Sequence, residues 1–198
     1  MNALEELKTH LKPGQVYRRF ELEQWSKAVD RHLKHLVESG VLQKMSQGLY
    51  YCPAKASFGE VPPQDEELVR SFLKSDDFLL TTPNFYNSLG VGTTQLYNKR
   101  VVYNHKRHGK FTLGGKEFDF RLKHKFPSKL TKEFLFVDLL NNVNELAEDK
   151  QEVLKRVSER AFQMKNLHLK RAVKSYAGER AKKMFDNLLK QGSVTHAG

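Results

Sequence analysis

The sequence has a single cysteine and no long hydrophobic run. Cys52 has no second cysteine with which to form an internal disulfide, so we interpret it as a small apolar strand residue in a reducing cytoplasm. No apolar run approaches the roughly 18 residues that a membrane-spanning helix needs. Residues 1–14 alternate apolar and charged side chains, unlike the continuous apolar core of a secretory signal. We therefore expect a cytoplasmic protein that does not act at a membrane.

The motifs of the common enzyme classes are also missing. Residues 88–95, SLGVGTTQ, contain a G-x-G, but the sequence has no Walker A loop, no dinucleotide-binding G-x-G-x-x-G and no nucleophile elbow. His32 and His35 stand one helical turn apart, and His105 and His108 stand among cations, without the carboxylates or cysteines of a metal site. We expect no enzyme, no catalytic residues, no metal and no cofactor, and the role of His105 and His108 stays open.

Positive charge is abundant and unevenly distributed. The chain has 34 Lys and Arg against 23 Asp and Glu, a formal net charge of +11. Residues 99–132 hold eleven bases and two acids, residues 150–190 hold twelve and four, and residues 1–55 hold nine and six. Residues 56–98 and 133–149 are acidic. Such clusters indicate basic surfaces, whose usual partners are nucleic acid, anionic lipid or an acidic protein.

The first 53 residues show a regular order of helix and strand signals. Apolar spacing predicts helices at 2–11, 20–25 and 26–39, an extended segment at 15–19, and strands at 41–45 and 49–53 around the turn 46–48. Ser26 is a candidate N-cap of the third helix, and Gly40 is its candidate C′ glycine. This order of elements predicts a winged helix-turn-helix.

The third predicted helix has an apolar face and a basic face. Val29, Leu33, Leu36 and Val37 share the inward arc. We expect this recognition helix to contact DNA through the residues of its outer face, Ser26, Lys27, Arg31, Lys34 and His35. We expect further contacts with phosphates or the minor groove from the wing, Lys44, Ser46 and Gln47, and with the DNA backbone from Arg18 and Arg19. A winged helix used only for protein interaction is the alternative.

The rest of the chain predicts a second domain of α+β class with a mostly antiparallel sheet and C-terminal helices. Patterns predict helices at 66–75, 83–92, 148–163 and 168–191, and strands at 78–82, 99–106, 109–125 and 134–143, with Gly114 and Gly115 at a hairpin turn. The predicted organisation is a winged helix at 1–55, a linker rich in Pro and Gly at 56–65, the α+β domain at 66–192 and a disordered tail at 193–198.

A second basic patch is expected on this domain. Its members are Lys99, Arg100, Lys106, Arg107, Lys123 and Lys125. Strand alternation places Phe118, Phe120 and Leu122 on one face, which we expect to be core, and Glu117, Asp119, Arg121 and Lys123 on the other. The patch could reach flanking phosphates or an acidic partner.

Several motifs together resemble the AbiEi-type antitoxins of type IV toxin–antitoxin (abortive infection) systems, which are winged-helix transcriptional regulators. Gly48, Tyr50 and Pro53 match the end of that family's wing. An L-G-x-x-T-Q-like helix end is matched by Leu89, Gly90, Thr93, Thr94 and Gln95, and a later turn by Leu113, Gly114 and Gly115. The resemblance covers about 170 residues, and the sequence departs from the family at Phe20 and Trp25.

The resemblance implies an antitoxin that binds repeats in its own promoter, on double-stranded DNA, and represses its operon. It implies that the second domain counteracts a nucleotidyltransferase toxin and supports cooperative DNA binding by a monomer or weak dimer. Arg31 stands where the family often has an arginine on the recognition helix. A standalone winged-helix regulator without a toxin partner and an RNA-binding accessory factor are the alternatives, and a cryptic enzyme in the second domain is disfavoured by the missing motifs.

Overall fold

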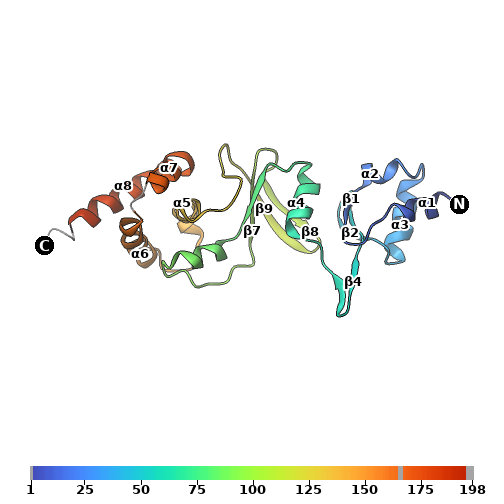
Figure 1. The fold of residues 1–198 in the computed structure, drawn as a ribbon, viewed down its shortest axis with the longest axis horizontal. Helices are drawn as coiled ribbons and strands as arrows, with labels where there is room; N and C mark the ends of the chain where they lie inside the picture. Colours follow the sequence, from blue (N-terminus) through green and yellow to red (C-terminus); the bar gives the residue numbers. More distant parts are fainter. Residues whose placement is uncertain (1, 165–166, 195–198) are drawn as a thin grey trace. The chain divides into compact units, whose positions relative to one another are not determined.

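The computed structural model describes residues 2–164 and 167–194, and the chain divides into two compact units. The first unit combines residues 1–78 with 106–120, and the second combines 79–105 with 121–198 (Figure 1). The protein is α+β, with antiparallel sheets and helices at its C-terminal end. In the described part of the chain, no helix combines the length and the apolar character needed to cross a membrane.

The first unit begins with three helices and a three-stranded sheet. Its elements are α1 (Ala3–Thr9), β1 (Val16–Arg18), α2 (Arg19–Glu23), α3 (Val29–Glu38), β2 (Gln43–Ser46) and β3 (Leu49–Tyr51). The sheet has the order β1-β3-β2, and both pairings are antiparallel. Each element predicted over these residues is confirmed.

The ends of α3 show how local sequence sets the helix. Gly40 has a φ of +73° directly after the C-cap Ser39, which confirms it as the C′ glycine. The prediction that Ser26 caps the helix is wrong. The helix begins at Val29, its N-cap is Ala28 without a side-chain hydrogen bond, and the Ser26 hydroxyl is buried against His32 instead.

A single apolar cluster holds these helices on the sheet. Its fully buried members come from all three helices and both flanks of β3: Leu7, Tyr17, Leu22, Val29, Leu33, Leu36, Leu42 and Cys52. Partly buried Trp25 packs on this cluster, and its ring stacks on His10 with centroids 4.4 Å apart. The bulky Trp25 in the turn before α3 is therefore accommodated by a partner ring from the end of α1.

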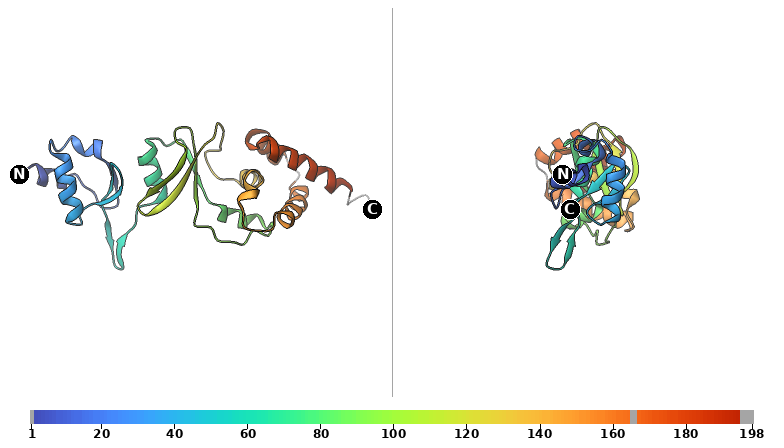
Figure 2. Two further views of the ribbon diagram at one scale, coloured as in Figure 1. Left: turned by 180° about the vertical axis from the view of Figure 1, so that it is seen from behind. Right: turned by 90° about the vertical axis from the view of Figure 1, so that its right-hand side faces the viewer.

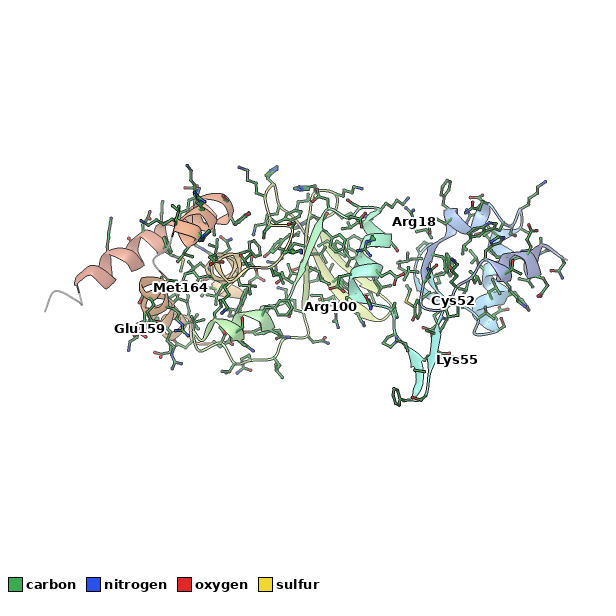
Figure 3. The ribbon with its side chains drawn as sticks, viewed as in Figure 1. Arg18, Cys52, Lys55, Arg100, Glu159 and Met164 are labelled. Carbon is green, nitrogen blue, oxygen red and sulfur yellow. The ribbon has the colours of Figure 1, made fainter. Side chains whose placement is uncertain are left out.

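Residues 54–61 form a hairpin that the sequence pattern did not predict. Strands β4 (Ala54–Ala56) and β5 (Gly59–Val61) pair antiparallel across the start of the region 56–65 expected to be linker (Figures 1 and 2). Lys55 lies on this hairpin (Figure 3), and Phe58 at its turn is 97% exposed. The Tyr51 hydroxyl donates to the Val61 carbonyl at 2.6 Å, which ties the base of the hairpin to β3.

The first unit also contains α4 (Asp65–Leu73) and the hairpin of β8 (Gly109–Leu113) and β9 (Lys116–Leu122). Phe72 of α4 contacts Phe111 and Phe120 of the hairpin, with ring centroids 5.0 and 5.2 Å apart. Phe118 and Phe120 are fully buried, which confirms that face of β9 as core. The same prediction is wrong for Leu122, which is 56% exposed because it ends the strand and lines a surface groove.

The hairpin belongs to a four-stranded sheet of order β6-β7-β9-β8. Its other strands are β6 (Phe78–Thr81) and β7 (Arg100–Asn104), and both confirm the sequence prediction. Between them lies the 3-10 helix η1 (Pro83–Leu89). It is closed by Gly90 with a φ of +66°, as the sequence predicts.

The second unit is built around α5 (Lys132–Asn142), followed by the short η2 (Val143–Glu145). The sequence prediction of a strand at 134–143 is wrong. The run is apolar on all sides, and such a run does not distinguish a buried strand from a buried helix. Thr131 favours the helix locally, because it is the N-cap and its side chain accepts a hydrogen bond from the Phe134 amide.

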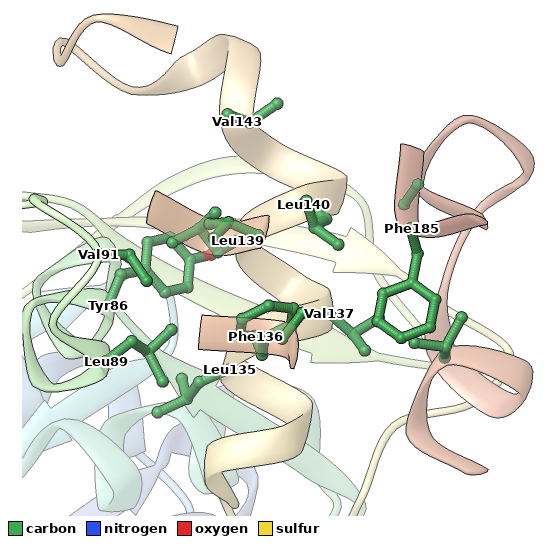
Figure 4. Packing of buried hydrophobic residues seen from close by; sticks show 14 of the residues in the cluster. Tyr86, Leu89, Val91, Leu135, Phe136, Val137, Leu139, Leu140, Val143 and Phe185 are labelled. Carbon is green, nitrogen blue, oxygen red and sulfur yellow. The ribbon is translucent and has the colours of Figure 1, made fainter. Parts of the chain in front are cut away.

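Neighbours on several sides cover α5 (Figure 4). Its side chains are directed toward Tyr86, Leu89 and Val91 on one side and toward Phe185 on another. The cover is completed by α6 (Lys150–Gln163), α7 (Leu167–Tyr176) and α8 (Glu179–Val194). This surrounding layer explains why every residue from Phe134 to Leu140 is buried.

The C-terminal helices depart from the prediction at two places. The helix expected over 168–191 is interrupted between α7 and α8, where the Gly178 amide donates to the Asn141 side chain at 2.9 Å instead of continuing one helix. Ser193 and Val194, expected in a disordered tail, belong to α8. The remainder of that expected tail, 195–198, lies outside the described residues.

The turn between β8 and β9 provides a stability test with a matched control. A Cβ on Gly114 would lie 2.8 Å from Sδ of Met45, whereas a Cβ on Gly115 would meet nothing within 4 Å. Both glycines have positive φ, so the backbone strain of alanine is shared. We expect Gly114→Ala to lower the free energy of unfolding by about 1–3 kcal/mol more than Gly115→Ala, as measured by urea denaturation. Equal losses would contradict this packing.

Candidate nucleic-acid interface

The exposed face of α3 and the turn before it carry the cations predicted to read DNA. Lys27, Arg31, Lys34 and His35 are all exposed, while Val29, Leu33 and Leu36 are buried on the other side. On this face Lys34 pairs with Glu38 at 3.9 Å, which is a weak surface contact. The structure therefore brings four of the five predicted recognition residues to one exposed surface.

Ser26, the fifth, is not on that surface. Its side chain is 3% exposed, and its Oγ lies 2.7 Å from Nδ1 of His32. This buried bond joins the turn before α3 to the helix itself. The contribution of Ser26 is to position the helix, and His32 is held in the same contact.

The two arginines at the start of α2 are held by carboxylates of this unit. Arg19 donates to both Asp30 oxygens, at 2.7 and 2.8 Å, and to Glu23 at 3.1 Å. The hydrogen bonds from Arg19 lower the pKa of Asp30. Arg18 pairs with Glu21 in the first turn of α2. The Arg19–Asp30 pair connects α2 with the first turn of α3, and the Arg18–Glu21 pair closes the first turn of α2, so both arginines fix local structure in addition to carrying charge.

The predicted wing is the β2–β3 hairpin. Lys44 and Gln47 are exposed, while the Ser46 hydroxyl is buried. The Gly48 carbonyl accepts a hydrogen bond from the Arg19 amide at 2.9 Å, which fixes the tip of the hairpin against the start of α2. Lys44 and Gln47 are the two predicted wing residues that the structure leaves accessible.

An open groove of about 830 Å³ runs beside α3. Lys27, Arg31 and His35 line it together with Glu6 of α1 and Glu23 of α2. The acidic side chains partly offset the positive potential on this flank. The most strongly basic part of the face is therefore along α3 itself.

The predicted second basic patch is largely paired within each unit. Lys106 and Arg107 belong to the first unit, where the Lys106 ammonium donates to the Leu73 and Lys74 carbonyls and Arg107 stacks over the Phe72 ring. In the second unit, the patch residues Lys99, Arg100, Lys123 and Lys125 have different environments. We treat the two groups separately.

Three of the second unit's cations contact acidic or polar partners. Lys99 pairs with Glu145 at 2.6 Å, and Arg100 donates to the Asn98 side chain at 3.4 Å. Lys123 lies 3.5 Å from the Asp138 carboxylate. Lys125 is exposed. The charge count of residues 99–132 therefore overstates the positive charge that this unit offers to a partner.

A buried polar cluster in the second unit was not predicted from the sequence. Asp138 of α5 is fully buried and accepts hydrogen bonds from the Tyr86 and Tyr103 hydroxyls at 2.7 and 2.6 Å. Asn142, one turn later, donates to the same two hydroxyls at 3.3 and 3.1 Å. A lone acid inside the apolar run 134–140 is the signal that could have identified it.

The cluster alters the acid–base behaviour of its members. Burial, together with the Asp138 charge, raises the pKa of both tyrosines. Burial lowers the pKa of Lys123, and the attraction of Asp138 opposes that effect in part. The Lys123 ammonium also lies 4.1 Å from the centre of the Tyr103 ring. Lys123 is thus a positioned cation at the edge of a buried carboxylate.

The segment SLGVGTTQ has a packing role in the second unit. Arg160 donates to the Leu89 carbonyl at 3.3 Å, and a Cβ on Gly92 would lie within 3.0–3.3 Å of the Arg156 side chain. The Glu148 carboxylate accepts from the Thr94 and Gln95 amides at 3.1 and 3.2 Å and from the Tyr97 hydroxyl. Main-chain groups of this segment thus form hydrogen bonds with side chains of the same unit.

In residues 2–164 and 167–194, no group of three or more His, Cys, Asp or Glu side chains is arranged to hold a metal ion. His105 stacks on Phe126, with ring centroids 4.8 Å apart. His108 is exposed. His32 is committed to Ser26, as described above.

Comparison with known proteins shows that the chain shares its fold with a solved structure. No protein-family model matches the chain, and no curated protein matches it significantly. The crystal structure of the RV2827C protein from Mycobacterium tuberculosis is similar to it, with a TM-score of 0.58 and 14% sequence identity. The alignment covers 96% of this chain and 75% of that one. At this identity the likeness concerns the fold alone.

Glu148 provides a pH test of the loop that it binds. Burial raises its pKa, but the hydrogen bonds from Tyr97, Gln95 and Thr94 outweigh burial, so the native pKa lies below the ordinary 4.5. Its stabilisation is therefore complete above about pH 4.5 and is lost as the pH falls through the lower native value. We expect Glu148→Gln to lower the free energy of unfolding by about 1 kcal/mol at pH 7. Between pH 5 and pH 3 the free energy of unfolding should then fall less steeply in the variant than in the wild type.

The measurement is urea denaturation at a series of pH values. Glu159→Gln is the matched control, because Glu159 is exposed on α6 (Figure 3). A pH profile of Glu148→Gln that is as steep as that of the wild type would contradict the assignment.

Proposed function

We propose that this protein is a DNA-binding transcriptional regulator whose residues 1–55 act as a winged helix-turn-helix. The observation that carries the proposal is the exposed cationic surface of α3 and the turn before it, with Lys27, Arg31, Lys34 and His35 opposite a buried face of Val29, His32, Leu33 and Leu36. The B-DNA major groove, about 12 Å wide, admits an α-helix, and Arg or Lys side chains pair with guanine there. The adjacent β2–β3 hairpin supports the proposal as a candidate wing.

The contacts around α3 suggest how recognition would be organised. Arg31 lies in the middle of the exposed face and is the residue to which we assign base reading. Lys44 and Gln47 on the hairpin would contact phosphates, which position the protein without reading sequence. Arg19, through Asp30, and Ser26, through His32, would hold α3 at a fixed angle to α2.

We further propose that the regulator is the antitoxin of a two-gene system that represses its own operon from the cytoplasm. This rests on the resemblance to AbiEi-type antitoxins in the wing ending, the LGVGTTQ segment and the LGG turn. In that proposal the second domain, residues 66–192, counteracts a nucleotidyltransferase toxin and supports cooperative binding to promoter repeats. A nucleotidyltransferase gene beside this one would support it, and co-expression with that enzyme would test neutralisation directly.

A standalone winged-helix regulator without a toxin is the second candidate. All of the proposed DNA contacts in this case lie within residues 1–55, so DNA binding does not require a toxin partner. The RNA-binding alternative is less favoured, because Lys99 and Arg121 share the Glu145 carboxylate and Lys123 lies at Asp138. This pairing reduces the positive charge along the extended surface that a polynucleotide would need, and leaves positive charge concentrated locally.

The recognition residue is tested with DNA sites selected from a random pool by the purified full chain. We expect Arg31→Ala to weaken binding to the selected site by about 1–3 kcal/mol and to relax the preference at one base pair, because a bidentate base contact is lost. Lys12→Ala, which removes an exposed cation outside α3, is the control. Full affinity of Arg31→Ala for the selected site would remove α3 from the role of recognition helix.

The wing makes a different prediction, because phosphate contacts carry no sequence information. Lys44→Ala should weaken binding to selected and unrelated duplexes by similar factors. It should also reduce the salt dependence of binding by about one phosphate contact. Titrations of both duplexes at several salt concentrations measure this. A loss limited to the selected duplex would make Lys44 a base reader and contradict the assignment.

A further inference from the structure

A basic groove opens on the surface of the second unit, between the end of β9 and the break that separates α7 from α8. Its volume is about 440 Å³, which falls within the range of small-molecule sites. It is lined by Tyr103, Arg121, Leu122, Lys123, His124, Lys125, Asn141, Asn142, Ser175, Tyr176, Ala177 and Gly178.

The charge of this groove has one sign. Arg121, Lys123 and Lys125 line it at alternate positions of the chain, with His124 between the last two, and no Asp or Glu is among the lining residues. Two carboxylates lie behind the lining residues: Asp138, which is fully buried and accepts hydrogen bonds from Tyr86 and Tyr103, and Glu145, which Arg121 shares with Lys99. The lining cations Arg121, Lys123 and Lys125 outnumber these two carboxylates, so the groove keeps a net positive charge that attracts an anion.

Two of the three cations are already held in position. Arg121 donates to the Asn142 side chain at 2.9 Å and to Glu145 at 2.7 Å. The Lys123 ammonium is fixed between Asp138 and the Tyr103 ring. Because these side chains have already lost much of their rotamer freedom, binding an anion would cost less conformational entropy than on a free surface. Lys125, in the segment that follows β9, is exposed and also lines the groove.

Asn141 fixes the part of the groove where α7 ends. Its side chain accepts from the Gly178 amide at 2.9 Å and donates to the Tyr176 carbonyl at 3.0 Å, which fixes the chain where α7 ends. Arg180 donates to the Asn141 carbonyl at 3.0 Å. Ser175 also lines the groove, and serine carries a neutral hydroxyl donor. Cations and neutral polar groups in one groove suit a compact oxyanion with several acceptor oxygens.

We propose that this groove binds the phosphate groups of a small phosphorylated ligand such as a nucleotide. Phosphate oxygens match the guanidinium and ammonium donors of Arg121, Lys123 and Lys125, and the volume suits a mononucleotide better than an extended polymer. The site lies in a different unit from α3, so it is independent of the proposed DNA recognition. A phosphate of a nucleic-acid backbone has the same chemistry and is separated from a free ligand by the experiment below.

The test is calorimetric titration of the full chain with pyrophosphate and with adenosine diphosphate. We expect saturable binding at one site. Lys125→Gln removes an exposed cation without disturbing the buried cluster, and it should weaken binding on the order of tenfold, because one charged hydrogen bond is lost. Lys129→Gln, which removes an exposed cation outside the groove lining, is the matched control and should bind as the wild type does.

Lys123→Met provides a second variant and should abolish binding, while Lys123→Arg keeps the charge and should retain it. If Lys123→Met does not fold, the Lys125→Gln comparison still decides. Absence of saturable binding, or equal affinities of Lys125→Gln and Lys129→Gln, would overturn the proposal.

A competition experiment identifies the source of the phosphate and keeps the result separate from the proposed DNA binding. Pyrophosphate affinity should be unchanged in Arg31→Ala, whatever that variant does to DNA binding. A short duplex that leaves bound pyrophosphate in place supports a free phosphorylated ligand. A duplex that displaces it from both wild type and Arg31→Ala would overturn the small ligand in favour of a nucleic-acid backbone.

Discussion

Asp138 lies in the middle of α5, where every residue from Phe134 to Leu140 is buried. A carboxylate in such a place is costly unless its oxygens are hydrogen-bonded and its charge has a partner. Tyr86 arrives from η1 and Tyr103 from β7 to donate to it, and Lys123 arrives from the end of β9. These requirements bring three distant segments together against one helix. Much of the architecture of the second unit follows from that requirement.

The same cluster connects the core with the surface. Lys123 is drawn toward Asp138 and over the Tyr103 ring, and this position places its ammonium at the edge of the basic groove. Asn142 bonds the tyrosines on the inside and lines the groove on the outside. The contacts that stabilise the buried Asp138 carboxylate thereby also place Lys123 and Asn142 at the groove where we propose that an anion binds. The proposed phosphate site depends on this arrangement more than on the total charge of the segment.

In the first unit, charge pairs fix geometry as well as contributing positive potential. Arg19 joins the start of α2 to Asp30 in the first turn of α3, and its amide holds the tip of the β2–β3 hairpin through Gly48. A winged helix needs a helix at a defined angle and an adjacent hairpin. Here Arg19 contacts both of them. Arg18 and Arg19 are therefore better understood as supports of the proposed interface than as free phosphate contacts.

The local elements of this protein could largely be predicted from its sequence, because they depend on interactions between near neighbours. The 3.6-residue spacing of Val29, Leu33 and Leu36 identifies the buried and exposed faces of α3, and Gly114 with Gly115 identifies the β8–β9 turn. The exposed cations of the proposed DNA interface follow from the same spacing. The sequence also contained the signal of Asp138, as a single acid in an apolar run, but not its partners.

Tertiary structure decided the features that depend on distant partners. The mostly apolar pattern of residues 134–143 predicts a buried strand, but the Thr131 cap and the packing of η1 and α6–α8 around these residues favour a helix. The sequence pattern predicts Ser26 as a helix cap, but its hydroxyl is buried against His32. The sequence also does not distinguish Lys123 from the other cations, whereas the structure places it beside Asp138. Local spacing determines which faces are apolar, whereas the partner of a buried polar group is set by segments far away in the chain.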